Sequence, residues 1–217
     1  MDRPKLKEIL QERLADKNLM RLIGKCLHVG VLDGEKFSEP EEGTVQGSCL
    51  SPLLGNIYLH HALDRWFEAE VKPRLKGRAA LVRFADDVVV GFEHQDDAEQ
   101  VMKILGERLA EYGLQLHPEK TRLVDYRRPS KFHKGGKGPG SIDFLGFRTY
   151  WKRGRSGGWH STSKTQDVRH RRMISSIYQW CRRHRHLRIK EQHEALTRKI
   201  RGHVNYFGVK GNERQLK

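Results

Sequence analysis

Two adjacent aspartates between two short apolar runs restrict the fold of this chain more than any other feature of its sequence. Residues 79–84 and 88–92 are rich in β-branched and aromatic side chains, as strands are. Between them lie only Ala85, Asp86 and Asp87, which leaves room for a tight turn and nothing longer. The pattern therefore predicts an antiparallel hairpin that carries two carboxylates at its tip.

The two carboxylates at this tip permit two interpretations. Like charges held this close repel each other unless a cation neutralises them, and a pair of Mg²⁺ ions about 3.5–4 Å apart serves phosphoryl transfer at such sites. A solvated Asp-Asp turn is the simpler alternative, and the pair taken alone favours it. Asp64, by contrast, lies on a predicted helix and is expected to have no partner, which makes it a comparison for Asp86.

The remaining patterns predict an α+β chain in which helices pack on short antiparallel strands. Apolar residues at helical spacing predict two helices before residue 30, one from Pro52 behind a Ser51 cap, and one from an Asp96 or Asp97 cap to Gly113. Residues 31–47 are expected to form a loop or a short hairpin. Further strands are predicted at 114–116, 121–124 and 142–147, loops at 134–140, 154–158 and 160–163, and basic helices at 165–187 and 190–207.

The net positive charge lies entirely in the C-terminal part of the chain. Residues 127–217 hold 24 Lys and Arg against five Asp and Glu, whereas residues 1–126 hold 18 against 22. Ten of the 18 aromatic residues also follow residue 126. Basic and aromatic side chains together neutralise phosphates and stack on bases, which favours a nucleic acid as partner over an anionic membrane. The expected contacts are seven arginines of one helical tract: Arg169, Arg171, Arg172, Arg182, Arg183, Arg185 and Arg188.

Other classes of function fit the sequence poorly. No apolar stretch approaches the roughly 20 residues that span a bilayer, and no secretory signal is visible, so a cytoplasmic location is expected. Three scattered cysteines without a Cys-x-x-Cys pair argue against a disulfide scaffold. Cys181, His184 and His186 lie among Arg residues and are assigned to a basic helix rather than to a zinc site.

Four motifs in a fixed order resemble the palm of the group II intron reverse transcriptase/maturase family. They are Val45-Gln46-Gly47-Ser48 with Ser51-Pro52, then Phe84-Ala85-Asp86-Asp87, then residues 113–121, then Phe144-Leu145-Gly146-Phe147. The second motif is similar to the family's Tyr-x-Asp-Asp box, with Phe in place of Tyr. Residues 198–207 resemble the helix signature of the maturase or thumb region. The resemblance covers nearly the whole chain, and the ordered set is far more specific than any single motif.

The resemblance implies a palm over residues 1–150, an antiparallel sheet with packed helices, followed by a basic helical thumb or maturase region over residues 160–217. It implies RNA-directed DNA synthesis coupled to the splicing and mobility of an intron RNA. The implied partners are intron or template RNA, a DNA primer or target, and dNTPs, with no membrane. Two Mg²⁺ ions are the implied cofactor, for which Mn²⁺ can substitute.

The resemblance also implies a role for each motif residue. Asp86 is the chief metal ligand, Asp87 is its weaker companion, and Lys120 lies near the triphosphate. The residues beside the template and the incoming nucleotide are Gln46, Gly47, Ser48, Phe84 and Ala85. The residues that grip the primer end are Phe144, Leu145, Gly146 and Phe147.

One acid of the family pattern has no match in the chain. The family takes a third essential carboxylate from an earlier strand, and Asp2-Arg3 aligns with the end of that motif, so the acid would fall just before Met1. The fingers would precede it, and the 217-residue chain is therefore expected to be inactive by itself. The alternatives are a non-catalytic RNA-binding maturase module and a reverse transcriptase of a retron or CRISPR-associated system.

Overall fold

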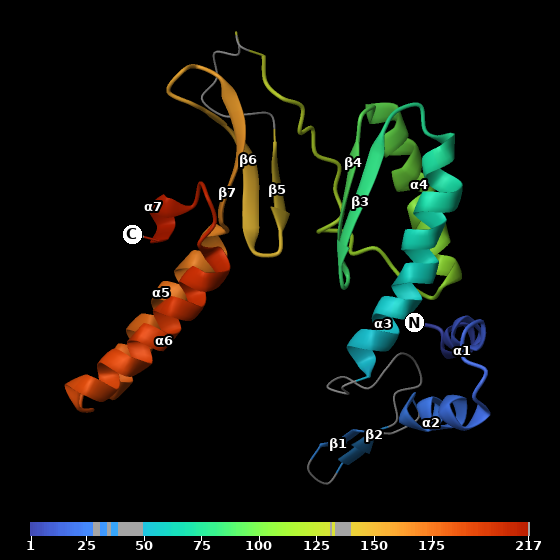
Figure 1. The fold of residues 1–217 in the computed structure, drawn as a ribbon, viewed down its shortest axis with the longest axis horizontal. Coiled ribbons are helices and arrows are strands. Elements are labelled where there is room, and N and C mark those ends of the chain that lie inside the picture. Colours follow the sequence, from blue (N-terminus) through green and yellow to red (C-terminus); the bar gives the residue numbers. More distant parts are fainter. Residues whose placement is uncertain (28–30, 34–35, 39–49, 131, 133–139, 217) are drawn as a thin grey trace. The chain divides into compact units, whose positions relative to one another are not determined.

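The chain forms two compact units that are described here one at a time. The structure is a computed structural model, and it describes residues 1–27, 31–33, 36–38, 50–130, 132 and 140–216 (Figure 1). The N-terminal unit comprises Met1–Leu123 and the C-terminal unit Val124–Lys217. Both combine helices with antiparallel strands, so the predicted α+β class is confirmed.

The N-terminal unit begins with the two predicted helices, α1 (Arg3–Gln11) and α2 (Lys17–Leu27). Asp2 caps the first of them, because its side chain accepts a hydrogen bond of 2.9 Å from the backbone N–H of Lys5. Strands β1 (Val31–Asp33) and β2 (Lys36–Ser38) pair antiparallel, which confirms the short hairpin among the two alternatives for this region.

A long helical rod follows, and it is not α-helical throughout. It starts as α3 (Ser51–Leu59), one residue before the predicted Pro52, and no side chain caps it at Leu50. It continues as the π-helical segments η1 (His60–Arg65) and η2 (Phe67–Val71) and closes with the 3₁₀ turn η3 (Lys72–Arg74). The wider π turns shift the faces of the rod relative to a regular 3.6-residue period.

Two apolar clusters hold the N-terminal unit together. The first joins α1, α2 and α3 and consists of Leu6, Ile9, Leu10, Leu27, Leu54 and Tyr58. Burial raises the pKa of Tyr58 to about 12, and its hydroxyl donates a 2.6 Å hydrogen bond to the carbonyl of Tyr112. The second cluster, around Phe67 and Val101, packs the rod and helix α4 (Gln95–Glu111) on one face of a β-hairpin.

This hairpin consists of β3 (Ala79–Phe84) and β4 (Asp87–Phe92), as predicted. Leu81 and Val90 face the helices, whereas Val82 and Phe84 lie on the opposite, exposed face.

Helix α4 ends as predicted, with Gly113 in the left-handed conformation at φ 62°. Its start differs from the prediction. Asp97 is buried and accepts hydrogen bonds from the backbone N–H groups of Lys76 and Gly77, so it fastens the preceding loop instead of capping its own helix.

The C-terminal unit contains a three-stranded antiparallel sheet of β5 (Ser141–Phe144), β6 (Phe147–Arg153) and β7 (Trp159–Thr165). The single strand predicted over 142–147 is therefore wrong, since a turn at Leu145-Gly146 divides it. Residues 160–163, predicted as a loop, lie in β7 and pair with β6. The strands predicted at 114–116 and 121–124 are not formed.

Two long helices leave this sheet and run antiparallel to each other (Figure 1). They are α5 (Asp167–His184) and α6 (Ile189–Phe207), which confirms both predicted basic helices. The short helix α7 (Glu213–Leu216) follows, and the buried Asn212 before it accepts from the N–H of Thr165 at 2.9 Å and donates to the carbonyl of Phe207 at 2.8 Å. Over the described residues, no helix combines the length and apolarity that crossing a membrane requires.

The two units divide at residue 123, whereas the predicted palm and thumb divide at residues 150–160. The two divisions describe different things, because the first reflects compactness and the second function. The functional boundary stays a prediction.

Replacing Gly146 by Ala should destabilise the C-terminal unit by about 1–2 kcal/mol, because an L side chain is disfavoured at positive φ. Gly146 has φ 82°, and an added Cβ would lie 3.3 Å from Cζ of Phe207. Gly202 in α6 is the matched control, since nothing lies within 4 Å of its Cβ position and Ala there should stabilise the helix by about 0.5–1 kcal/mol. Urea unfolding of both variants measures the difference. If both substitutions changed the free energy of unfolding by the same amount and in the same direction, the assigned conformation of Gly146 would be contradicted.

Candidate active site and nucleic-acid interface

The tip of the β3–β4 hairpin is a two-residue turn. Phe84 pairs with Asp87 as the last couple of the ladder, which leaves Ala85 and Asp86 as the turn residues. Ala85 has φ 52°, a left-handed conformation that costs a non-glycine residue about 1–2 kcal/mol. Phe84 to Asp87 are all exposed, and 64% of Phe84 is open to solvent. The predicted presentation of two carboxylates at a hairpin tip is confirmed.

The two carboxylates of this turn are free to bind a ligand from solution. Among the described residues, neither Asp86 nor Asp87 has an ion-pair partner. Carboxylate oxygens are the ligands that Mg²⁺ prefers, so the donor chemistry fits that ion. Two carboxylates are only part of an octahedral shell, however, and the described part of the chain contains no group of three or more acidic, His or Cys side chains that could hold a metal. Their role as metal ligands stays a prediction.

The backbone of this turn is tied to the helical rod by Arg83. Its Nε and Nη2 donate to the two carboxylate oxygens of Asp64 at 2.8 and 2.6 Å. Its Nη1 donates to Oδ1 of Asn56 at 2.9 Å and to the carbonyl oxygen of Ala85, inside the turn, at 3.0 Å. The expectation that Asp64 has no partner is wrong, because this bidentate contact occupies both of its oxygens, and His60 Nδ1 lies 3.2 Å from one of them.

The Arg83–Asp64 pair is shielded from water. The two side chains are 12% and 23% exposed. Burial by itself would raise the pKa of Asp64, but the hydrogen bonds from Arg83 and His60 outweigh it and lower that pKa below its ordinary value. The same hydrogen bonds to Asp64 raise the pKa of Arg83, against the opposing effect of burial. Both groups therefore stay ionised, and the contact is a charge-assisted one.

The predicted primer grip forms a second hairpin turn, in the C-terminal unit. Phe144 pairs with Phe147, and Leu145 and Gly146 make the turn with φ 50° and 82°. Tyr206 donates a 3.0 Å hydrogen bond from its hydroxyl to the carbonyl of Leu145, and its ring stacks on Phe147 at 5.8 Å. Phe207, the next residue of α6, packs on the same Phe147 ring.

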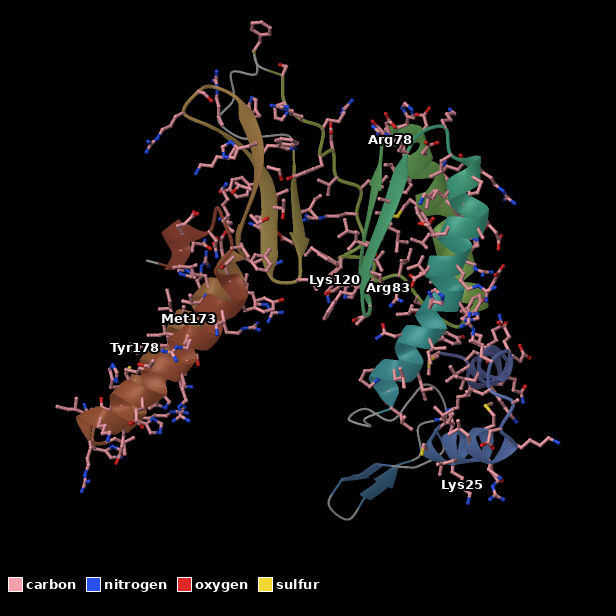
Figure 2. The ribbon with its side chains drawn as sticks, in the orientation of Figure 1. Lys25, Arg78, Arg83, Lys120, Met173 and Tyr178 are labelled. Atoms are coloured by element: carbon pink, nitrogen blue, oxygen red, sulfur yellow. The ribbon has the colours of Figure 1, made fainter. Side chains whose placement is uncertain are left out.

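No contact that the structure gives joins Lys120 to the β3–β4 turn. Lys120 lies on the loop after α4 (Figure 2) and is exposed, and within the described ranges it forms no ion pair. Gln46, Gly47 and Ser48 lie outside the described residues.

The predicted arginine tract lies on α5 and on the loop between α5 and α6. All seven predicted arginines are exposed, and none of them forms an ion pair with a described residue. On α5, Met173 is half-buried, whereas Tyr178 is 62% exposed (both are labelled in Figure 2). Unpaired guanidinium groups on an open helix are available to phosphates.

Comparison with known proteins supports a particular family. A family model described as reverse transcriptase (RNA-dependent DNA polymerase) matches residues 3–149. This segment contains the β3–β4 hairpin, the loop with Lys120 and the turn of β5 and β6.

Several curated proteins are similar to parts of this chain. Protein YkfC of Escherichia coli is 28% identical over 202 residues, which is 79% of this chain and 49% of that protein. Group II intron-encoded protein LtrA of Lactococcus lactis is 40% identical over 58 residues, 27% of this chain and 10% of that protein. The putative COX1/OXI3 intron 1 protein of Saccharomyces cerevisiae is 25% identical over 163 residues, 53% of this chain and 19% of that protein. The chain thus spans about half the length of the first relative and a fifth or less of the others.

Proposed function

Because the chain belongs to the reverse transcriptase family, and group II intron-encoded proteins are among its relatives, we propose that it acts in RNA-directed DNA synthesis and in the maturation of an intron RNA. In this proposal residues 1–150 supply the palm and residues 160–217 the thumb or maturase region. The substrates are an RNA template, a DNA primer or target, and dNTPs.

The observation that carries the proposal is the presentation of Asp86 and Asp87. Their carboxylates are exposed, have no ion-pair partner among the described residues, and sit on a turn whose backbone is held from the helical rod. Asp86 is the principal ligand for a divalent ion and Asp87 the weaker one. Such an ion supplies stabilisation of the attacking and leaving oxygens in phosphoryl transfer.

The remaining residues bind and orient the substrates. Lys120 contacts the triphosphate and gives a proton to the leaving pyrophosphate. The template and the incoming nucleotide contact Phe84 and Ala85, together with Gln46, Gly47 and Ser48. The primer end is gripped by the turn from Phe144 to Phe147.

A second candidate function is favoured by the basic surface alone. The seven exposed arginines of α5 and the α5–α6 loop do not depend on the acids of the turn. A non-catalytic maturase module would need only this surface to bind intron RNA.

Primer extension distinguishes these two functions. The assay contains an RNA template, a DNA primer, dNTPs and Mg²⁺, with the 217-residue chain alone or supplemented with the segment that precedes the match in a group II intron-encoded relative. We expect synthesis only in the supplemented reaction, because positioning and charge stabilisation supply most of phosphoryl-transfer catalysis and the described residues bring only two carboxylates to the hairpin tip. Asp86→Asn should abolish that synthesis, whereas Glu107→Gln, on the exposed side of α4, should not. RNA binding without synthesis in any reaction would favour the maturase module.

A further inference from the structure

We propose that Arg83 is a positioning residue, which fixes the Ala85–Asp86 turn against the helical rod and so presents the two carboxylates in one orientation. The metal-binding consequence rests on the proposed function, whereas the ordering of the turn does not. Arg83 touches neither carboxylate of the pair Asp86 and Asp87 by any contact that the structure gives. Arg83 acts on the two carboxylates through the backbone of the turn, whose Ala85 carbonyl it holds.

The geometry of the guanidinium group supports this role. A guanidinium is a rigid planar fork with five donors, and here it makes four hydrogen bonds to acceptor atoms on three residues. Asp64 and Asn56 lie in the rod, 19 and 27 residues before Arg83, and Ala85 lies in the turn. The guanidinium therefore joins the rod to the hairpin turn, which the chain itself connects only through residues 75–78 and strand β3. A lysine ammonium has only three donors and no planar fork, so a lysine at this position could not make all four contacts.

The conformation of the turn explains why it requires such support. Ala85 is in the left-handed region, which L side chains rarely adopt, so the turn would relax if only the two strands held it. Among the described residues, the non-glycine positions with positive φ are Ala85 and Leu145. In both hairpins the carbonyl of that residue accepts a hydrogen bond from a side chain, Arg83 in one and Tyr206 in the other.

A second arginine on the same hairpin provides a matched control. Arg78 lies at the opposite end from the turn (Figure 2) and pairs with Glu93 at 3.1 Å. Its side chain is 93% exposed and contacts only the carboxylate across the open end of the strands. Replacing Arg78 removes the same charge from the same hairpin without touching the turn.

The experiment compares four variants of the 217-residue chain: Arg83→Met, Asp64→Leu, the double variant and Arg78→Met. Amide hydrogen exchange at residues 85–88 reports the order of the turn, with α4 amides as the reference for global opening. Titration with Mn²⁺, followed by the loss of the free-ion electron paramagnetic resonance signal, reports the carboxylates. We expect faster exchange at the turn and about tenfold weaker Mn²⁺ binding in both single variants, with no further loss in the double variant. Arg78→Met should resemble the wild type.

The sign of the Mn²⁺ effect separates positioning from charge. Arg83 is a cation beside a cation site, so if it acted only by its charge, Arg83→Met would bind Mn²⁺ more tightly. Unchanged exchange at the turn in Arg83→Met would overturn the proposal. So would Mn²⁺ binding by Arg83→Met that is as tight as or tighter than that of the wild type, provided that the wild type binds Mn²⁺ at the turn. If the wild type binds no Mn²⁺ at the turn, the metal assignment fails, and the exchange result alone decides whether Arg83 orders the turn. If Arg83→Met does not fold, Asn56→Ala, which removes an exposed partner of the same guanidinium, should still accelerate exchange.

Discussion

Asp86→Asn should abolish cleavage of the chain at the β3–β4 turn when Fe²⁺ replaces Mg²⁺ in the presence of ascorbate and peroxide. Radicals form at the bound ion and cut the backbone beside it, so the cut position reports where the ion binds. Asp86 and Asp87 are exposed carboxylates on one turn, and a divalent ion needs both charges in a site with so few protein ligands. We expect cuts at residues 84–88 in the wild type and at least about tenfold weaker Mn²⁺ binding in the variant.

The control for this experiment must be chosen with the structure in view. Asp64 is unsuitable, because its replacement also frees Arg83 and disturbs the turn. Glu107 is exposed on α4 and has no ion-pair partner among the described residues, so Glu107→Gln removes one negative charge and nothing else. Cuts of equal strength in the wild type and in Asp86→Asn would refute the metal assignment. Loss of the cuts in Glu107→Gln as well would show that only the overall charge matters.

The hairpin and the helices could be predicted because their signals are local. Strand-forming runs on either side of Ala85-Asp86-Asp87 leave no alternative to a turn, and the apolar spacing of α5 and α6 is helical over many residues. The turn at Leu145-Gly146 has no such signal, since Leu is unusual at positive φ. It depends on pairing with β6 and on Tyr206, which lies 61 residues away.

The partner of Asp64 could not be predicted, although part of the signal was present. Alternation along β3 places Arg83 on the same face as Leu81, and a charge on a helix-covered face requires a partner. The sequence does not say which face is covered, because Val82 and Phe84 on the other face are just as apolar. In addition, Asp64 lies in a π-helical segment, where a 3.6-residue period no longer gives the direction of a side chain.

The basic surface should bind structured RNA with a steep dependence on salt. Each phosphate that a cation neutralises releases counterions, which gives a log–log slope of roughly −0.7 per contact on single strands and −0.9 on duplex DNA. Replacing Arg182, Arg183 and Arg185 by Ala should therefore flatten the slope by about two to three, measured by filter binding of the full chain from low to moderate salt. An unchanged slope in this variant would show that these arginines of the α5 surface do not contact the RNA.

A control variant with the same net charge as the α5 triple variant tests whether the position of the removed cations matters. Arg13, Arg74 and Lys103 are exposed cations of the N-terminal unit, and replacing all three by Ala lowers the charge of the chain as much as the α5 triple does. If RNA binds at α5, only the α5 triple flattens the slope, since the counterions are released locally. The arginine spacing supports such a row: Arg171 and Arg182 are eleven residues apart, about 16 Å along the helix and on nearly the same side, and Arg172 and Arg183 repeat the interval. Asp86→Asn should leave the slope unchanged, because Asp86 belongs to the other compact unit and is not one of the cations whose phosphate contacts release counterions.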